Sequence, residues 1–430
     1  MKQAPKPQLR LQSWFLPALV GLLLILQLVA PYRGWRILLV GLGGAWLVSY
    51  LWAQSLARSL RLTREMRFGW AQVGDKISER FTLANDGRVP ALWVEVVDHS
   101  TIPNYQASRG ISVDSQRGIK WHREAICTHR GLFTLGPTTL QTGDPFGLYT
   151  VTLHYPASLP LMVLPPIVPL PAIEVAPGGR VGEGRPRANA LERSVSVAGV
   201  REYHPEDSFR WIHWRTSAHR DSLFVRVFDG TPASDWWILL DMGWRVQVGE
   251  GPDSTAEHAV ILAASLADRG LRSGQAVGLA AQGEQLVWLP PREGEGQRWE
   301  VLRSLAMVSL GSRSLAELLA GIRPALEQHT SLVIITPDVD TAWVEALVLL
   351  LRRGAIPTVL LLDPISFGGT DDSSMAQALL VDLGVVNYVI TRDLLDRPEV
   401  RPTRQGHLGK PIPGTVPVRQ PRQVGWEVLS

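Results

Sequence analysis

Two long apolar segments near the start of the chain are separated by a short turn. Residues 14–30 contain no charged side chain, and residues 37–56 contain none either. Each segment is about as long as a helix that crosses the hydrocarbon core of a bilayer. Because residues 31–36 leave room only for a turn, the pattern predicts a helical hairpin with transmembrane helices at about 14–30 and 36–56.

Lysine and arginine are distributed unevenly around this hairpin. Three precede the first segment, four follow the second within a dozen residues, and two lie in the turn. The positive-inside rule therefore predicts a multi-pass protein of the cell membrane with two spans and with both termini in the cytoplasm. Two alternatives stay open. A cleavable signal peptide is disfavoured by Leu28 at the −3 position of a cut after Ala30, and a hairpin buried in a soluble core is the other.

The pattern changes to short runs with a period of two after residue 67, as in residues 77–83 and 92–97. Strands at this spacing are typical of an antiparallel sandwich. A distinctive turn follows at residues 143–148, where we expect Phe146 and Leu148 to pin the chain to the core. No nucleophile–base pair and no metal-ligand spacing is present in this β-rich stretch.

Buried-strand runs alternate with amphipathic helices in the C-terminal half, which predicts a doubly wound parallel sheet. The expected strands are 236–241, 275–281, 331–336 and 357–362, the expected helices are 254–269, 298–309, 315–327 and 341–353, and a last helix–strand pair is expected near 374–390. The predicted domains are a membrane anchor (1–67), a β-rich sandwich-like domain (68–175), a linker (176–196), a motif plus α/β domain (197–395) and a Pro/Arg-rich tail (396–430).

The charge distribution argues against a nucleic-acid partner. The 430 residues carry a formal charge of +3, but residues 1–67 hold nine Lys or Arg against Glu65 alone, a net +8. The remaining residues hold 34 positive and 39 negative side chains, a net −5, so the body of the protein is mildly acidic. The single cysteine, Cys127, excludes an intramolecular disulfide and fits a reducing compartment.

The densest group of arginines, acids and aromatics lies at residues 199–228. This segment resembles the bacterial family called domain of unknown function 58, whose signature reads approximately R-x-Y-x-P-G-D-x-x-R-x-I-D-W-x-x-S-A-R and continues into a Leu-x-Val-[Lys/Arg] strand. The matching residues are Arg201, Tyr203, Pro205, Asp207, Arg210, Ile212, Trp214, Ser217, Ala218, Leu223, Val225 and Arg226. The chain departs from the signature at Glu206, His213 and His219.

The resemblance implies an architecture for the whole chain. Family members typically have two N-terminal spans, a β-rich segment that ends in an Asp-Pro-Phe-Gly-Leu-like corner, and a von Willebrand factor type A-like α/β domain. The resemblance also implies a partner, a MoxR-type AAA ATPase, and a role in protein assembly or in processes of the cell envelope.

The motif itself allows three interpretations. In the first, Asp207 with Arg201 or Arg210 forms a charge-assisted network that fixes a turn. In the second, the motif is a protein-docking surface that involves Arg201, Tyr203, Asp207, Arg210, Trp214, Ser217 and Arg226. In the third, His204, Asp207, His213 and His219 form a metal or acid–base site, although their spacing is not that of a compact ligand set.

Two acids, Asp241 and Asp338, lie at predicted strand ends, where ligands bind in doubly wound sheets. In type A domains the first strand ends in Asp-x-Ser-x-Ser and holds a divalent cation. Here the segment is Asp241-Met-Gly-Trp-Arg245, so both hydroxyls are replaced and a guanidinium opposes a cation. We therefore expect remnants of a degenerate site and no bound metal, with Arg245 able to neutralise Asp241. No phosphate-binding loop is present, and we expect no cofactor.

The sequence thus favours a non-enzymatic, membrane-anchored cytoplasmic scaffold that interacts with other proteins. The alternative is a metal-dependent hydrolase that uses the segment from His204 to His219. A third possibility is a metal-dependent adhesion module that faces outward. The sequence does not identify the client protein.

Overall fold

The computed structural model describes residues 6–66, 69–170, 173–176, 197–204, 212–220, 222–228, 235–327 and 330–395. The chain divides into two compact units, with the boundary between Leu164 and Pro165. Most of the predicted linker and all of the predicted C-terminal tail lie outside the described residues. Each unit is considered by itself.

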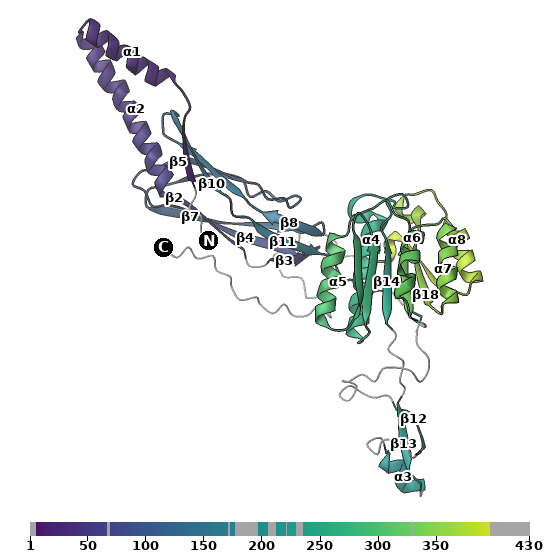
Figure 1. The fold of residues 1–430 in the computed structure, drawn as a ribbon. Coiled ribbons are helices and arrows are strands. Elements are labelled where there is room, and N and C mark those ends of the chain that lie inside the picture. Colours follow the sequence, from purple (N-terminus) through teal and green to yellow (C-terminus); the bar gives the residue numbers. More distant parts are fainter. Residues whose placement is uncertain are drawn as a thin grey trace. The chain divides into compact units, whose positions relative to one another are not determined.

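Unit 1 begins with the helical hairpin. Helix α1 spans Phe15–Val29 and α2 spans Arg33–Ser59, and the two helices lie side by side (Figure 1). Among the described residues, α2 is the one helix that is both long and apolar enough to cross a membrane, and α1 is a shorter apolar helix. The predicted ends of the first helix agree with the structure to within a residue, whereas α2 is three residues longer than predicted at each end.

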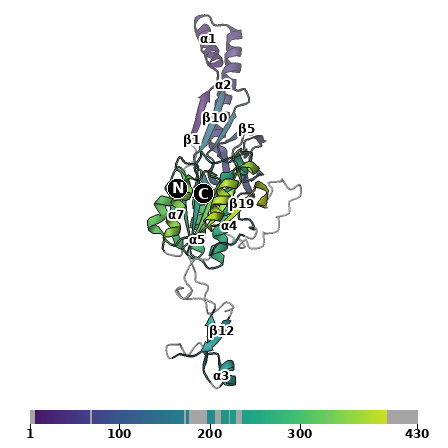
Figure 2. The ribbon, with the colours of Figure 1, turned by 90° about the vertical axis from the view of Figure 1, so that its right-hand side faces the viewer.

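Strands of the sandwich flank the hairpin on both sides, which corrects the prediction that residues 1–67 form an anchor alone. Strand β1 (Lys6–Leu11) precedes α1 and pairs in antiparallel fashion with β10 (Tyr149–Tyr155), as Figure 2 illustrates. Strand β2 (Leu60–Met66) follows α2 directly and pairs with β4 (Lys76–Asn85). The sequence pattern does not reveal these strands because both are short, β1 lies just before the first apolar segment, and β2 follows α2 without a turn signal.

The β-rich part of unit 1 contains three sheets, with strand orders β1-β10-β9-β5-β6, β2-β4-β7 and β3-β11-β8. The remaining strands are β3 (Trp70–Gln72), β5 (Ala91–Asp98), β6 (Arg109–Val113), β7 (Arg117–Ile126), β8 (Gly131–Leu135), β9 (Thr138–Gly143) and β11 (Leu159–Leu164). The strands predicted at 77–83 and 92–97 are present as β4 and β5. Alternate residues of β4 are buried, and the ring of Phe81 stacks on Trp121 with centroids 5.3 Å apart.

The C-terminal half of α2 is part of the sandwich core. The Trp46 indole Nε1 donates a 2.7 Å hydrogen bond to the Tyr149 hydroxyl, and the Trp52 Nε1 donates to the Pro90 carbonyl at 3.1 Å. Ala53 and Leu56 are fully buried in the same apolar cluster as the strands. Hairpin and sandwich are therefore one compact unit.

Unit 2 contains a mixed six-stranded sheet in the order β16-β15-β14-β17-β18-β19. Its strands are β14 (Trp236–Asp241), β15 (Val277–Gln282), β16 (Leu286–Arg292), β17 (Ser331–Thr336), β18 (Ile356–Leu362) and β19 (Val386–Ile390). All neighbours are parallel except β15 and β16. The predicted all-parallel sheet is thus wrong at one edge, where the consecutive prolines 290 and 291 suit an edge strand.

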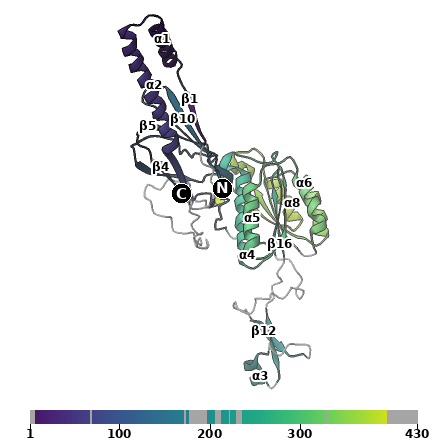
Figure 3. The same ribbon diagram turned by 60° about the vertical axis from the view of Figure 1, so that its left-hand side comes forward.

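Helices cover both faces of this sheet (Figures 1 and 3). On one side lie α4 (Thr255–Arg272) and α5 (Glu295–Met307), and on the other lie α6 (Leu315–Ile322), α7 (Ala342–Arg352) and α8 (Ser374–Asp382). Short 3₁₀ turns span Gly251–Asp253, Arg323–Ala325, Pro364–Phe367 and Arg392–Leu394. The Ser254 side chain accepts a hydrogen bond from the Glu257 amide and caps the N-terminus of α4.

The motif segment forms a small element of its own. Strands β12 (Val197–Glu202) and β13 (Phe224–Phe228) pair in antiparallel fashion, and helix α3 (Trp214–Arg220) lies between them in the sequence.

Candidate functional site

The motif segment is held together by a small buried cluster. Ile212 forms a β-bridge with Val225, and both side chains are buried together with Phe224. The amide of Tyr203 donates to the Leu223 carbonyl at 2.7 Å, which extends the pairing beyond β12. We call this element, residues 197–204 and 212–228 as far as they are described, the motif module.

Ser217 locks α3 onto β13. Its hydroxyl accepts a 2.8 Å hydrogen bond from the Phe224 amide and donates to the His213 carbonyl at 3.2 Å. The side chain is buried, so Ser217 determines how the helix sits on the strand. A partner protein would not contact it directly, which makes Ser217 a positioning residue.

Trp214, one turn before Ser217, has the opposite environment. Its side chain lies on the surface, with 67% of its area exposed. An indole that is held outward by a helix whose other face is locked suits the role of an anchor at a protein interface. Tyr203 is half-buried.

The histidines of the motif module do not form a metal centre in the part of the chain that the structure describes. The Nδ1 of His213 interacts with the Thr216 hydroxyl at 2.7 Å and accepts from the Thr216 amide at 3.2 Å. His204 and His219 are exposed. Among the described residues, no three His, Cys, Asp or Glu side chains are placed to hold a metal ion.

Of the four remaining predicted motif residues, two lie on the paired strands and two lie outside the described residues. Asp207 and Arg210 lie outside the described residues. Arg201 lies on β12 and Arg226 on β13, and in the backbone register of the two strands Arg201 pairs with Val225 and Val200 pairs with Arg226. The proposed network of Asp207 with Arg201 or Arg210 therefore stays a prediction.

A second candidate site lies at the carboxyl ends of β14 and β17, where the strand order of the sheet reverses. This switch point is where doubly wound sheets bind ligands. Asp241 ends β14 and is almost completely buried. Its Oδ2 accepts from the Thr336 hydroxyl at 2.6 Å, and its Oδ1 accepts from the Gly243 amide at 3.0 Å. Both carboxylate oxygens are thus used within the fold.

Asp338 lies next to this pair. Its amide donates to the Thr336 hydroxyl at 2.9 Å, and its Oδ1 accepts from the Asp340 amide at 3.0 Å. Burial, together with the charge of Asp241, raises the pKa of Asp338 to about 6, although the Asp340 amide opposes the shift. Burial also raises the pKa of Asp241, against the two hydrogen bonds that it accepts.

Arg245 takes no part in this cluster. Its guanidinium carbon lies 5.5 Å from the centre of the Trp244 ring, and the side chain is exposed. The expectation that Arg245 neutralises Asp241 is therefore wrong. Trp244 is held in place by its amide, which donates to the Gly311 carbonyl at 2.8 Å.

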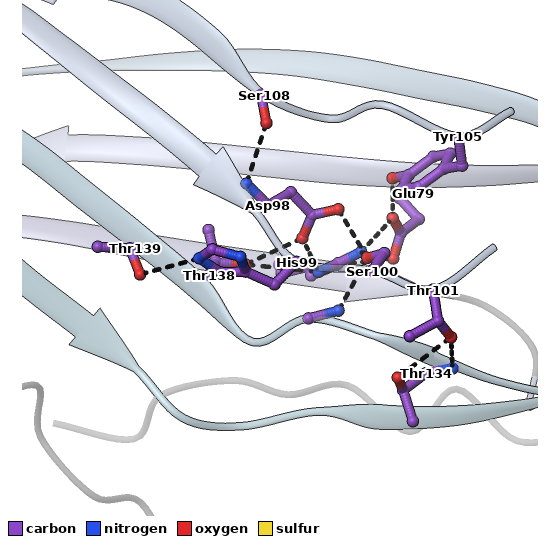
Figure 4. Close-up of polar contacts among 12 residues, drawn as sticks. Glu79, Asp98, His99, Ser100, Thr101, Tyr105, Ser108, Thr134, Thr138 and Thr139 are labelled. Atoms are coloured by element: carbon purple, nitrogen blue, oxygen red, sulfur yellow. Dashed lines mark hydrogen bonds and ion pairs between the residues drawn. The ribbon is translucent and has the colours of Figure 1, made fainter. Parts of the chain in front are cut away.

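A buried ionic network in unit 1 was missed by the sequence reasoning (Figure 4). Arg64 on β2 donates to both carboxylate oxygens of Glu79 on β4, at 2.8 and 2.7 Å, and to Asp98 on β5 at 2.8 Å. The hydroxyls of Ser100 and Tyr105 complete the shell, the first bonded to Asp98 and the second to Glu79. Glu79 is fully buried.

This network joins strands from two sheets. Burial opposes the charge on Arg64, but hydrogen bonding to Glu79 and the nearby carboxylates outweigh it, so the pKa of Arg64 is raised. Because β2 follows α2 directly, the network fixes the strand that leaves the hairpin. In the sequence, Arg64 and Glu79 are simply a basic and an acidic residue on two separate strands. That they meet follows from the register of β2 against β4, which the sequence pattern alone does not give.

One family model matches the motif module and much of unit 2. Residues 199–366 match the family described as "Protein of unknown function DUF58". The chain is also 23% identical over 257 residues to the "Uncharacterized protein YeaD" of Bacillus subtilis (strain 168). That alignment covers 58% of this chain and 63% of the relative, so the chain spans slightly less than two thirds of the relative's length.

Some solved structures match a part of the chain. The CARDB domain of the PF1109 protein from Pyrococcus furiosus is 10% identical over 24% of this chain and 94% of its own, with a TM-score of 0.18. A complex of zinc 2-glycoprotein and prolactin inducible protein from human seminal plasma is 7% identical over 25% of this chain and 96% of that chain, with a TM-score of 0.20. Scores this low support no conclusion on fold or function.

Proposed function

We propose that this protein is a non-enzymatic scaffold, anchored in the cell membrane by the α1–α2 hairpin, which carries its two units on the cytoplasmic side. The observation that carries the proposal is the position of β1 and β2. These strands enter and leave the hairpin, and both belong to unit 1. A segment that leaves a compact unit and returns to the same unit must cross a bilayer an even number of times. The hairpin between β1 and β2 therefore fits two spans.

The charge distribution supports the cytoplasmic orientation. Arg10 and Arg58 lie at the sandwich end of the hairpin together with the arginines of β2, whereas Arg33 and Arg36 lie at its tip. The excess of positive charge at the sandwich end is the arrangement that the positive-inside rule associates with the cytoplasm.

We further propose that unit 2 is a type A-like domain without a bound metal. The strand order, third-second-first-fourth-fifth-sixth in chain order, is one of the common doubly wound arrangements. Both carboxylate oxygens of Asp241 accept hydrogen bonds, from Thr336 and Gly243, and this disfavours Asp241 as a cation ligand.

The partner that the family resemblance implies is a MoxR-type AAA ATPase, and Trp214 of the motif module is the side chain that we propose contacts it. The test is purification of the tagged full-length chain from membranes, with the ATPase added in its ATP-bound and ADP-bound states. We expect recovery of the ATPase in one state and a loss of recovery in Trp214→Ala.

The matched control is Trp244→Ala, because Trp244 is also an exposed tryptophan but lies outside the motif module. If the wild type, Trp214→Ala and Trp244→Ala all recover the same amount of ATPase, Trp214 is rejected as the contact. A failure to recover the ATPase in either nucleotide state would reject the partnership itself.

A further inference from the structure

The end of the sandwich that joins the hairpin exposes large apolar side chains. Phe146, in the corner between β9 and β10, has 61% of its surface exposed, which corrects the expectation that it pins the corner to the core. Leu148 alone does so, since it is buried. On β5, Leu92 and Trp93 are both exposed, at 52% and 44%.

The local backbone directs these side chains outward. The pairing of β5 with β6 shifts register between Ala91 and Val94, so the two consecutive residues between them do not alternate between the faces of the sheet. In the corner, both oxygens of the buried Asp144 are occupied, by the amides of Phe146 at 2.9 Å and Tyr149 at 2.6 Å. The exposed position of Phe146 is therefore built into the turn.

This apolar end is tied directly to the base of the hairpin. The amide of Gln12 donates to the Leu148 carbonyl at 2.7 Å, two residues before the exposed Trp14. On the other side, Tyr149 accepts from Trp46 of α2. We call the exposed side chains of Trp14, Leu92, Trp93 and Phe146 the apolar collar.

The length of the hairpin brings the apolar collar close to a membrane. Helix α1 has 15 residues, about 22 Å at the rise of an α-helix, and the hydrocarbon core of a bilayer is about 30 Å thick. Below this depth α2 is docked on the sandwich, yet Leu47, Val48 and Leu51 remain exposed on its outer side. When a span is shorter than the hydrocarbon core, apolar surface next to the span can make up the missing length. The domain attached to the span then lies in the headgroup region.

We propose that the apolar collar is a lipid-binding surface that inserts into the headgroup boundary of the bilayer, so that the sandwich rests on the membrane instead of being held away from it. This inference rests on the proposed membrane anchor. Aromatic side chains at the base of a span favour this boundary, and the collar is continuous with the surface of the hairpin. An alternative occupant, a second copy of the chain, is an outcome of the test below.

The experiment uses the full chain in vesicles of phosphatidylcholine and phosphatidylglycerol. A fluorescent maleimide probe is attached to single cysteines, and nitroxides are carried by lipids either at the headgroup or deep in the acyl chain. The only natural cysteine, Cys127, is buried, and burial raises its pKa to about 11, so the unsubstituted chain serves as the unlabelled blank.

Probes at Pro145→Cys and Leu92→Cys report on the collar, and either suffices if the other fails to fold. A probe at Val40→Cys, an exposed position of α2, reports on the hairpin. The control is Leu132→Cys on β8, which is equally exposed but lies at the opposite end of the sandwich, where Thr101 beyond β5 bonds to Thr134.

We expect deep-nitroxide quenching at Val40, and headgroup quenching at Pro145 and Leu92 that is several-fold stronger than at Leu132. Adding Phe146→Asp should reduce the quenching at Leu92 severalfold, whereas adding Leu132→Asp should not. Quenching at Val40 with none at the collar would overturn the inference and leave the anchor intact. Collar probes that are shielded in a protein-concentration-dependent way, without lipid quenching, would overturn it in favour of a second copy. No quenching at Val40 would reject the anchor.

Discussion

The indole of Trp46 on α2 donates a 2.7 Å hydrogen bond to the hydroxyl of Tyr149 on β10, and this contact joins the hairpin to the sandwich. Tyr149 also packs edge-to-face on Tyr50. Tyr149→Phe keeps the ring and removes the acceptor, so we expect a loss of about 1 kcal/mol in stability. Hydrogen exchange should rise in residues 46–56 of α2 and in β1. Tyr32→Phe, at the exposed tip of the hairpin, is the matched control; equal exchange in both variants would show that the contact does not hold the helix.

Arg64 is expected to be the most sensitive ionic position in unit 1. Arg64→Met leaves the buried carboxylates of Glu79 and Asp98 without their cation, and breaking a buried pair in this way costs about 3–5 kcal/mol. The control is Arg61→Met on the same strand, whose partner Asp86 is exposed, and which should cost less than about 1 kcal/mol. Chemical denaturation followed by tryptophan fluorescence compares them. Similar losses in the two variants would contradict a structural role for the network.

Ser217→Ala should loosen the motif module. The substitution removes the hydroxyl that accepts from the amide of Phe224, and the loss of one such hydrogen bond costs about 0.5–1.5 kcal/mol. We expect faster hydrogen exchange in α3 and β13 and weaker binding to the partner, because Trp214 loses its fixed position. Ser217→Thr retains the hydroxyl and should restore much of the protection. Unchanged exchange in Ser217→Ala would show that the serine does not lock the helix.

Asp338 should make unit 2 less stable as the pH rises. Its pKa is raised to about 6 in the folded state from an ordinary value near 4, so the folded state binds more protons than the unfolded state between these values. Stability is therefore greatest below about pH 4 with respect to this group and declines as the pH rises through 6.

Asp338→Asn keeps the acceptor for the Asp340 amide and removes the charge. We expect a gain of about 1–2 kcal/mol at pH 7.5, after allowance for solvent screening, and a smaller difference at pH 4.5. Hydrogen exchange in β14 and β17, corrected for intrinsic rates, measures both. The control is Asp382→Asn, an exposed acid on α8. A gain that is the same at both pH values would contradict the shifted pKa of Asp338.

The elements with strong local signals could be predicted from the sequence. The helical hairpin and the buried strand at 331–336 both match, because length, hydrophobic pattern and charge are read within one segment. Features that depend on partners distant in the sequence could not be predicted. The pairing of β1 with β10 joins residues about 140 apart in the chain, and the outward turn of Phe146 depends on a corner whose core side is already filled by Leu148.

The candidate sites show the same difference between local signals and contacts made across the fold. Asp241 was identified because it ends a buried strand, but its use by Thr336 depends on the neighbouring strand β17. Arg245 was assigned to the wrong partner because only the fold decides whether its side chain reaches the carboxylate or lies on Trp244. Arg64 was counted as a flanking charge of the hairpin, although it is in fact the centre of a buried network.

The most direct test of the central proposal is the sidedness of the hairpin ends. Single cysteines at Gln8 before α1, Tyr32 in the turn and Leu132 on β8 are all at exposed positions, and a membrane-impermeant maleimide can be applied to intact or lysed cells. We predict labelling of Tyr32→Cys in intact cells, and labelling of Gln8→Cys and Leu132→Cys only after lysis. Labelling of Gln8→Cys and Leu132→Cys from opposite sides, or of both in intact cells, would contradict a cytoplasmic protein anchored by a two-span hairpin.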